Sequence, residues 1–197
     1  MILTIRGTSG CGKTTLARRV KDWWGDDWDE VKFENGKITG YTSRNVFLFG
    51  PYVDGLQSGG VDSVKWGEFR FRKTRMDYIE EWCVKGYHVI HEGLMESAEV
   101  VRTAGWNKTY PVHAIFLDVP LQDCLDWINK RRVARGKMEP VNPKLTSDKF
   151  RELQRVQKRL VAAGVDAQWL SREAAFIHIC EILKETGGYS AERDRLG

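Results

Sequence analysis

The feature that most constrains this chain is a glycine-rich pattern close to its N-terminus. Residues 7–14 read Gly-Thr-Ser-Gly-Cys-Gly-Lys-Thr, a match to Gly-x-x-x-x-Gly-Lys-Thr. A β-prone run over residues 2–6 precedes the pattern, and apolar residues at helical spacing over residues 14–24 follow it. In that setting the glycines turn backbone N–H groups inward at a helix N-terminus, which makes the match specific. The pattern therefore predicts a loop that binds the phosphates of a nucleoside triphosphate.

Individual positions of this loop receive separate roles. We expect Lys13 to reach the β- and γ-phosphates and the Thr14 hydroxyl to bind Mg²⁺. Thr15 is more suited to capping or packing. The predicted nucleotide-binding residues of the loop are Gly7, Thr8, Ser9, Gly10, Cys11, Gly12, Lys13, Thr14 and Thr15.

Further along the chain, predicted strands alternate with predicted helices. Strand patterns occur at residues 46–49, 87–91, 112–119 and 165–169, and helical patterns at residues 66–85, 95–104, 121–135, 147–163 and 172–185. Asn35-Gly36 lies between two short β-prone runs and predicts a hairpin. This order predicts an α/β protein with a mostly parallel five-stranded sheet flanked by helices. We expect one domain over residues 1–186 and a flexible tail over residues 187–197.

The cysteines and the apolar runs of the sequence indicate the compartment in which the protein works. The four cysteines are far apart in sequence, which indicates free thiols in a reducing cytoplasm rather than a disulfide framework. No apolar run approaches the roughly 20 residues of a membrane span, and the N-terminus lacks the pattern of a signal peptide. We therefore expect a cytoplasmic protein with no membrane partner, whereas its oligomeric state stays open.

Four carboxylates are candidates for chemistry beside the phosphates. Glu92 and Asp118 each follow a predicted strand, and ligands bind at the carboxyl ends of such strands. Glu92 is favoured as the Mg²⁺-side group because Gly93 beside it leaves room for a ligand, although either could cap a helix. Asp54 and Asp62 lie in a glycine-rich loop and could accept a proton from an acceptor hydroxyl. Turn formation is the simpler role for Asp54 and an equal alternative for Asp62.

A basic segment follows the predicted helix 121–135. Residues 128–160 carry eleven Lys or Arg and three acidic residues, a local charge of +8. Arg131, Arg132 and Arg135 lie where small nucleotide kinases carry their lid, here predicted over residues 131–146. Arginine suits a lid because its planar fork pairs with phosphate oxygens and remains charged. We expect Arg131 and Arg135 to stabilise the transferring phosphoryl group and Arg132 to contact the nucleotide.

The eight tryptophans are many for a chain of 197 residues. Four of them, Trp23, Trp82, Trp127 and Trp169, follow helical or strand patterns. We interpret these four as core residues.

The combination of motifs resembles a known enzyme family. It comprises residues 5–15, 49–52, 59–62, 88–94, 115–121, 129–136, 141–144 and 149–150, spread from the first strand towards Val165. Together these segments resemble the phage-encoded P-loop kinases related to thymidylate kinase, and among them the phage hydroxymethyluracil DNA kinases. The Gly-Gly-x-Asp segment ending at Asp62 and the Asn-Pro-Lys segment ending at Lys144 are the more specific parts.

This resemblance implies a P-loop NTPase fold of the nucleoside monophosphate kinase-like class, and it implies a reaction. Such a kinase would transfer the γ-phosphate of ATP, with Mg²⁺, to the hydroxymethyl group of 5-hydroxymethyluracil already built into DNA, as one step of base hypermodification. The acceptor base would have to be flipped out of a duplex or presented in a single strand. Two alternatives remain open at this point, a nucleoside or deoxynucleoside monophosphate kinase and a non-catalytic nucleotide-binding module.

Overall fold

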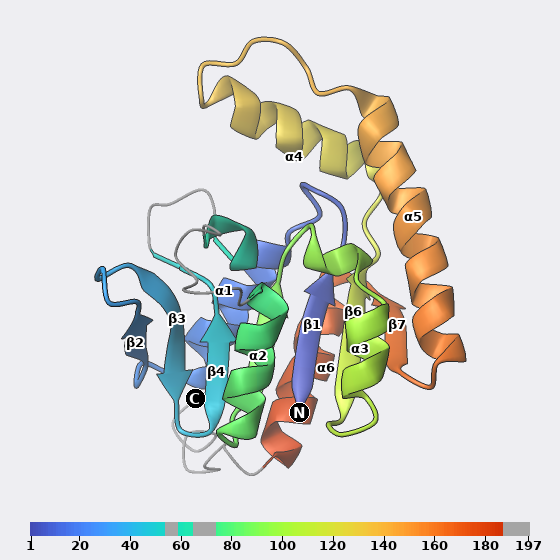
Figure 1. Ribbon diagram of the computed structural model, residues 1–197. Coiled ribbons are helices and arrows are strands. Elements are labelled where there is room, and N and C mark those ends of the chain that lie inside the picture. Colours follow the sequence, from blue (N-terminus) through green and yellow to red (C-terminus); the bar gives the residue numbers. More distant parts are fainter. Residues whose placement is uncertain (54–58, 65–73, 187–197) are drawn as a thin grey trace.

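The computed structural model describes residues 1–53, 59–64 and 74–186 (Figure 1). Asp54, the predicted tail over residues 187–197 and residues 66–73 of the predicted helix 66–85 lie outside the described residues. The described elements form one central sheet with helices on both of its faces.

The sheet has the strand order β2-β3-β4-β5-β1-β6-β7. The five strands from β4 to β7 in this order are parallel, whereas β2 and β3 extend the sheet in antiparallel fashion. The bounds are β1 Ile2–Arg6, β2 Asp29–Lys32, β3 Ile38–Ser43, β4 Val46–Phe49, β5 His88–Glu92, β6 Val112–Leu117 and β7 Asp166–Leu170. The prediction of a mostly parallel α/β sheet is thus confirmed.

The predicted count of five strands is wrong, because the sheet has seven strands within the described residues alone. The two extra strands are β2 and β3, the hairpin around the predicted Asn35-Gly36 turn. Gly36 has φ 78°, a conformation that favours glycine. Hairpin periodicity alone does not say whether the pair joins the central sheet. Here β3 pairs with β4 from Gly40↔Phe49 to Ser43↔Val46, which makes it continuous with the parallel strands.

Two apolar layers cover the two faces of the sheet. One layer packs helices α1 (Lys13–Trp24) and α6 (Arg172–Glu185) against Leu3 and Ile5 of β1. The other packs α2 (Arg75–Val84), α3 (Val101–Trp106) and α5 (Pro143–Ala162) against Ile2 of the same strand and its neighbours. Adjacent residues of β1 thus face opposite layers, as strand geometry requires. In the described part of the chain, no helix has the length and apolarity to cross a bilayer.

The predicted lid corresponds to the end of α4 (Leu121–Val133), residues 134–142 and the start of α5. In Figure 1 this segment stands above the edge of the sheet where the parallel strands end. Helix α5 begins at Pro143, four residues earlier than predicted. Asn142 caps it by accepting a hydrogen bond from Lys144 N at 3.0 Å, and Pro143 is tolerated in the first turn, which needs no N–H from it. The irregular part of the lid is therefore shorter than the predicted gap between the helices 121–135 and 147–163.

Candidate active site

The predicted phosphate loop connects β1 to α1, so the strand–loop–helix order expected for it is present. Gly12 precedes the helix with φ 96°, and it has no side chain to satisfy the first N–H groups of α1, which a bound anion could use instead. The side chain of Lys13 is buried and folds back over the loop. Its Nζ donates hydrogen bonds to the carbonyl oxygens of Gly7 and Thr8, each at 2.9 Å. The loop thus holds the ammonium group at its own centre.

Glu92 lies at the end of β5, directly beside the phosphate loop. Strand β5 pairs with β1 in the register Ile5↔Glu92, so its carboxyl end meets the start of the loop. Thr14 Oγ1 donates to Glu92 Oε1 at 2.7 Å. Burial raises the pKa of Glu92 to about 7, against the opposing effects of Lys13 and of the Thr14 hydrogen bond. The predicted proximity of Thr14 and Glu92 is present in the fold.

Thr14 and Glu92 fit the coordination chemistry of Mg²⁺. A hydroxyl and a carboxylate are hard oxygen ligands, and Mg²⁺ commonly takes one or two protein ligands together with phosphate oxygens and water. Within the described residues no group of three or more His, Cys, Asp or Glu side chains forms a metal cluster. The pair therefore suits a nucleotide-bound Mg²⁺ better than a site built from protein alone.

The segment Gly59-Gly60 crosses directly over this pair. A Cβ on Gly60 would overlap Glu92 Oε1 and lie 2.5 Å from Glu92 Cδ, while one on Gly59 would lie 2.8 Å from Thr14 Cγ2. Gly60 also has φ 75° and ψ −177°, a region that side-chain-bearing residues avoid. Both glycines are therefore needed for the close approach, and Gly60 shields one face of the Glu92 carboxyl group.

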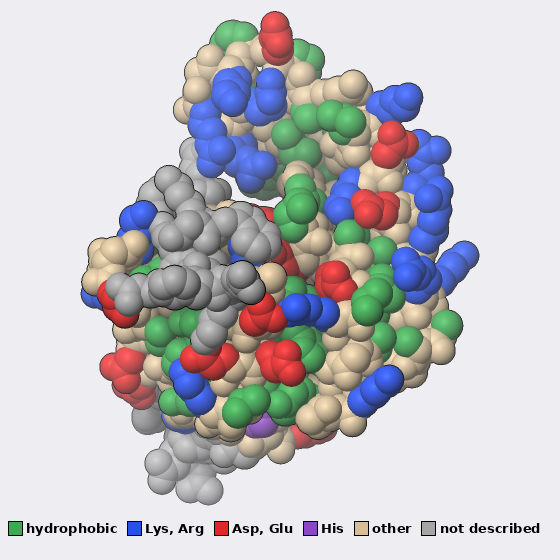
Figure 2. All heavy atoms as spheres, viewed as in Figure 1, with side chains coloured by type: hydrophobic (Ala, Val, Ile, Leu, Met, Phe, Trp, Pro, Cys, Tyr) green, Lys and Arg blue, Asp and Glu red, His purple; other side chains and the backbone are tan. Residues whose placement is uncertain are grey.

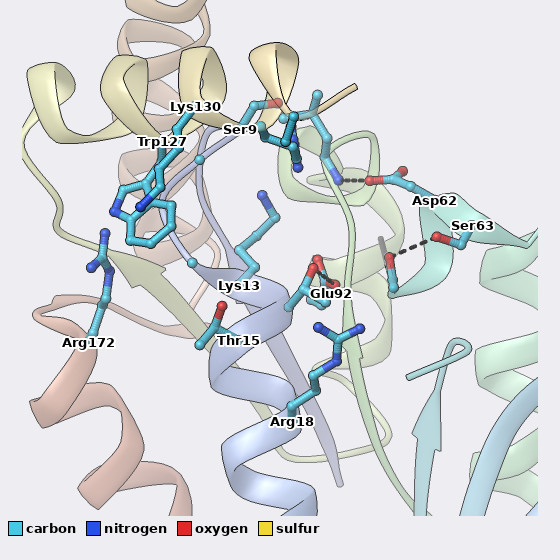
Figure 3. A pocket seen from close by; sticks show the side chains of 17 residues that line it. Ser9, Lys13, Thr15, Arg18, Asp62, Ser63, Glu92, Trp127, Lys130 and Arg172 are labelled. Carbon is cyan, nitrogen blue, oxygen red and sulfur yellow. Dashed lines mark hydrogen bonds between the residues drawn. The ribbon is translucent and has the colours of Figure 1, made fainter. Parts of the chain in front are cut away.

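Asp62 follows in the short helix η1 (Val61–Ser63). It lines one cavity together with Thr14 and Glu92 (Figure 3). Its Oδ2 accepts a hydrogen bond from Leu94 N at 2.5 Å, and its side chain is 38% exposed. Asp62 and Glu92 thus belong to one site although 30 positions separate them. The structure does not bring Asp118 into it: Asp118 is exposed beyond β6 and is not among the cavity-lining residues.

Two charged residues behind Asp62 were missed by sequence reasoning. Arg75 starts α2, and Glu96 starts the short helix η3 (Glu96–Ala98); both side chains are buried and Arg75 Nη1 donates to Glu96 Oε1 at 3.2 Å. Neither belongs to a motif, since 20 positions lie between them and a buried ion pair has no local sequence pattern. The burial of two charges could be found only from tertiary structure.

A cavity of about 880 Å³ joins the phosphate loop to the lid. Of the predicted lid residues, Arg131 lines it, whereas Arg132 and Arg135 do not. Arg132 Nε donates to the carbonyl oxygen of Glu139 at 2.8 Å and so braces the lid itself. Arg131 is half-buried, and burial followed by the charge of Arg135 lowers its pKa. The lining residues are Ser9, Gly10, Gly12, Lys13, Thr14, Thr15, Arg18, Gly59, Asp62, Ser63, Glu92, Leu94, Trp127, Lys130, Arg131, Ala134 and Arg172.

Three predicted nucleotide-binding residues of the loop, Gly7, Thr8 and Cys11, are also absent from these lining residues. Thr8 and Cys11 are buried beneath the loop, and Thr8 Oγ1 lies 3.5 Å from Cys124 Sγ. Burial raises the pKa of the Cys11 thiol, which keeps it protonated. The side chains of these residues support the loop from inside.

The far side of the cavity carries a tryptophan that sequence reasoning assigned to the core. Trp127 on α4 is 53% exposed and lines the cavity, with Lys130 Nζ 5.2 Å from the centre of its ring. Arg172, the first residue of α6, donates from Nε to the carbonyl oxygen of Cys11 at 3.0 Å. Figure 3 shows Trp127 and Arg172 on one side of Lys13 and Asp62 on the other. The core assignment failed for Trp127 because α4 leaves the body of the protein to form the lid.

Comparison with known proteins identifies two phage relatives. The chain is 31% identical over 192 residues to a protein named 5-hmdU DNA kinase from Pseudomonas phage PaMx11, an alignment that spans 93% of this chain and 97% of the relative. A second protein of that name, from Delftia phage PhiW-14, is 24% identical over 177 residues, spanning 83% of this chain and 65% of the relative. No protein-family model matches the sequence.

Proposed function

This chain belongs to the family of the phage 5-hmdU DNA kinases, and from that premise we propose that it phosphorylates the hydroxymethyl group of 5-hydroxymethyluracil in DNA. The observation that carries the proposal is the convergence of the phosphate loop, Glu92 and Asp62 on one cavity under a basic lid. A phosphoryl donor and a hydroxyl acceptor can then meet with a carboxylate beside each.

The donor is ATP, held at residues 7–15. Backbone N–H groups of the loop and Lys13 bind its phosphates, and the Thr14–Glu92 pair would hold Mg²⁺. Held there, Mg²⁺ would offset the negative charge of the phosphates. Trp127 and Arg172 lie on the side of Lys13 away from Asp62, and their ring and guanidinium suit the faces of a nucleobase. We assign the ATP base to that side.

The acceptor binds on the Asp62 side. Gly60 covers one face of the Glu92 carboxyl group, whereas the Asp62 side chain is 38% exposed. Asp62 is therefore more accessible than Glu92 to an acceptor hydroxyl. Asp62 takes the hydroxyl proton, the hydroxyl oxygen bonds to the γ-phosphorus, and the bond between that phosphorus and the β–γ bridging oxygen breaks to release ADP. Arg131, which lines the cavity, offsets negative charge on the oxygens of the transferred phosphoryl group. Arg132 and Arg135 do not line the cavity in this structure, and they would reach the phosphates when the lid closes.

DNA would approach along the lid. Figure 2 shows Lys and Arg side chains gathered on this segment above a hollow. Phosphate contacts by such side chains release counterions, so binding to DNA is expected to weaken steeply as salt rises. A kinase for free nucleotides would show a much smaller salt effect, which separates the two enzyme classes.

The test offers γ-labelled ATP and two acceptors side by side. One is duplex DNA containing 5-hydroxymethyluracil, with the matching thymine-only duplex as control; the other is a panel of free deoxynucleosides and their monophosphates. Label in the modified duplex alone supports the proposal. Label in a free nucleotide alone would identify a nucleotide kinase, and no label in any acceptor would favour a non-catalytic nucleotide-binding module.

A further inference from the structure

Arg75 is a buried arginine immediately behind Asp62. Its side chain is 8% exposed, and it is not among the residues that line the cavity. Its Nε and Nη2 both donate to the carbonyl oxygen of Val64, at 3.3 and 2.8 Å. Through these bonds α2 holds the end of the segment that carries Asp62.

The remaining nitrogen of Arg75 faces two carboxyl groups. Nη1 lies 3.2 Å from Glu96 Oε1 and 3.7 Å from Asp62 Oδ1. Gly93 makes this convergence possible: a Cβ there would overlap Glu96 Oε2 and lie 3.4 Å from Asp62 Oδ1. The Glu96 side chain is only 6% exposed, and Oε2 has no hydrogen-bond partner among the described residues. The Arg75 guanidinium therefore interacts with two carboxyl groups that lie on different segments.

Asp62 is consequently held from two directions. Leu94 N binds Oδ2 from the loop after β5, and Arg75 attracts Oδ1 from α2. Each contact uses a different oxygen, so together they restrict rotation of the carboxyl group. What remains free is the exposed side that faces the cavity, where the acceptor hydroxyl must bind.

We propose that Arg75 is a positioning residue that acts through Asp62, with Glu96 orienting the Arg75 fork. This inference rests on the proposed function, in which Asp62 is the base. Because Arg75 does not line the cavity, it serves the reaction by fixing the Asp62 carboxylate at the distance and angle that proton transfer needs. General-base catalysis is worth about 10²–10⁴-fold, and imprecise placement forfeits part of it.

The experiment is a double-mutant cycle in which kcat is measured at saturating ATP and modified duplex DNA, and KM for ATP is measured in a separate titration of ATP. Arg75→Lys keeps the charge and loses the fork, and Asp62→Asn removes the base. We expect Arg75→Lys to lower kcat by about tenfold or more while KM for ATP stays unchanged. In the Asp62→Asn background the same substitution should change kcat by less than about twofold, because its effect passes through the missing carboxylate.

Arg102→Lys is the matched control. Arg102 also braces the start of α2, through Thr74 and Asp77, but has no contact with Asp62 among those the structure gives it. It should leave kcat within about twofold of the wild type, which separates positioning of the base from anchoring of the helix. If Arg75→Lys does not fold, as judged by circular dichroism, Glu96→Ala replaces it in the same cycle, since it removes the partner that orients the fork.

Three results would overturn the inference. The first is a change in kcat on Arg75→Lys that is equal in both backgrounds, and the second is a loss of kcat on Arg102→Lys as large as that on Arg75→Lys. The third is an Asp62→Asn enzyme with near-wild-type kcat. Failure of the wild-type protein to label the modified duplex would instead refute the proposed function. A kcat loss confined to the background with Asp62 supports the inference.

Discussion

Gly60→Ala offers the sharpest test of how the site is assembled. The new Cβ would overlap Glu92 Oε1 and lie 2.5 Å from Glu92 Cδ and 2.9 Å from the Glu92 carbonyl oxygen. The carbonyl belongs to the backbone of β5, so the side chain alone cannot relieve the contact. Backbone strain at φ 75° and ψ −177° adds roughly 1–3 kcal/mol, and overpacking adds roughly 1–3 kcal/mol. We expect a loss of about 2–6 kcal/mol in the free energy of unfolding.

The functional effect of the same substitution should be larger. The segment at residues 59–60 can relieve the overlap by moving away from Glu92, which also moves Asp62, or by displacing Glu92 from Thr14. Either shift disturbs the geometry on which transfer depends, so we expect kcat to fall by about 100-fold or more. Phosphate transfer to modified DNA is measured beside unfolding in urea.

Gly36→Ala is the matched control for Gly60→Ala. Gly36 also has a positive φ, 78°, but a Cβ there would meet nothing within 4 Å. It should cost about 1 kcal/mol of stability and leave kcat unchanged. If both variants showed the same stability and the same activity, the argument that Gly60 is required for the contact with Glu92 would be refuted.

Three further predictions address the carboxyl group, the buried arginine and the tryptophan. Glu92 has a higher pKa in the folded state, so without Mg²⁺ the free energy of unfolding should fall as pH rises from about 4.5 to about 7. Between pH 5 and pH 8 this loss amounts to about 2.5 kcal/mol, and urea unfolding at the two pH values should show that Glu92→Gln removes it; an unchanged pH dependence would contradict the assignment. Arg6→Met should destabilise by about 2–4 kcal/mol, since fully buried Arg6 donates to the carbonyls of Ser97 and Glu99. The exposed control Arg19→Met should leave the free energy of unfolding close to that of the wild type in the same denaturation assay, because its ion pair with Glu173 is open to solvent. Trp127→Ala should raise KM for ATP roughly tenfold with little change in kcat, whereas equal KM values would remove Trp127 from the donor site.

Much of the fold follows from local sequence patterns. The strand–loop–helix unit around Lys13 and the alternation of strands and helices were predictable, because residues close in sequence determine both. The pairing of Thr14 with Glu92 was also foreseeable: carboxyl ends of parallel strands meet at one edge of the sheet. The membership of β2 and β3 in that sheet was not, since a hairpin pattern carries no information about which edge it joins.

Helix boundaries and surface exposure were the weaker part of the sequence interpretation. The helix predicted from residue 147 begins at Pro143, because Asn142 caps its first turn. Trp127 has helical spacing but lies on a helix that leaves the body of the protein, so its ring faces the cavity. Periodicity predicts which side of a helix is apolar, and only the fold decides what that side meets.

Local sequence patterns predict the strand–loop–helix unit around Lys13, the α/β order of elements and the glycine-rich segment that ends at Asp62. These are local properties of a few consecutive residues. Only the tertiary structure brought Asp62, Arg75 and Glu96 together around Gly93. Their association depends on the packing of three separate segments, which buries Arg75 and Glu96 beside each other. No short run of residues encodes that packing.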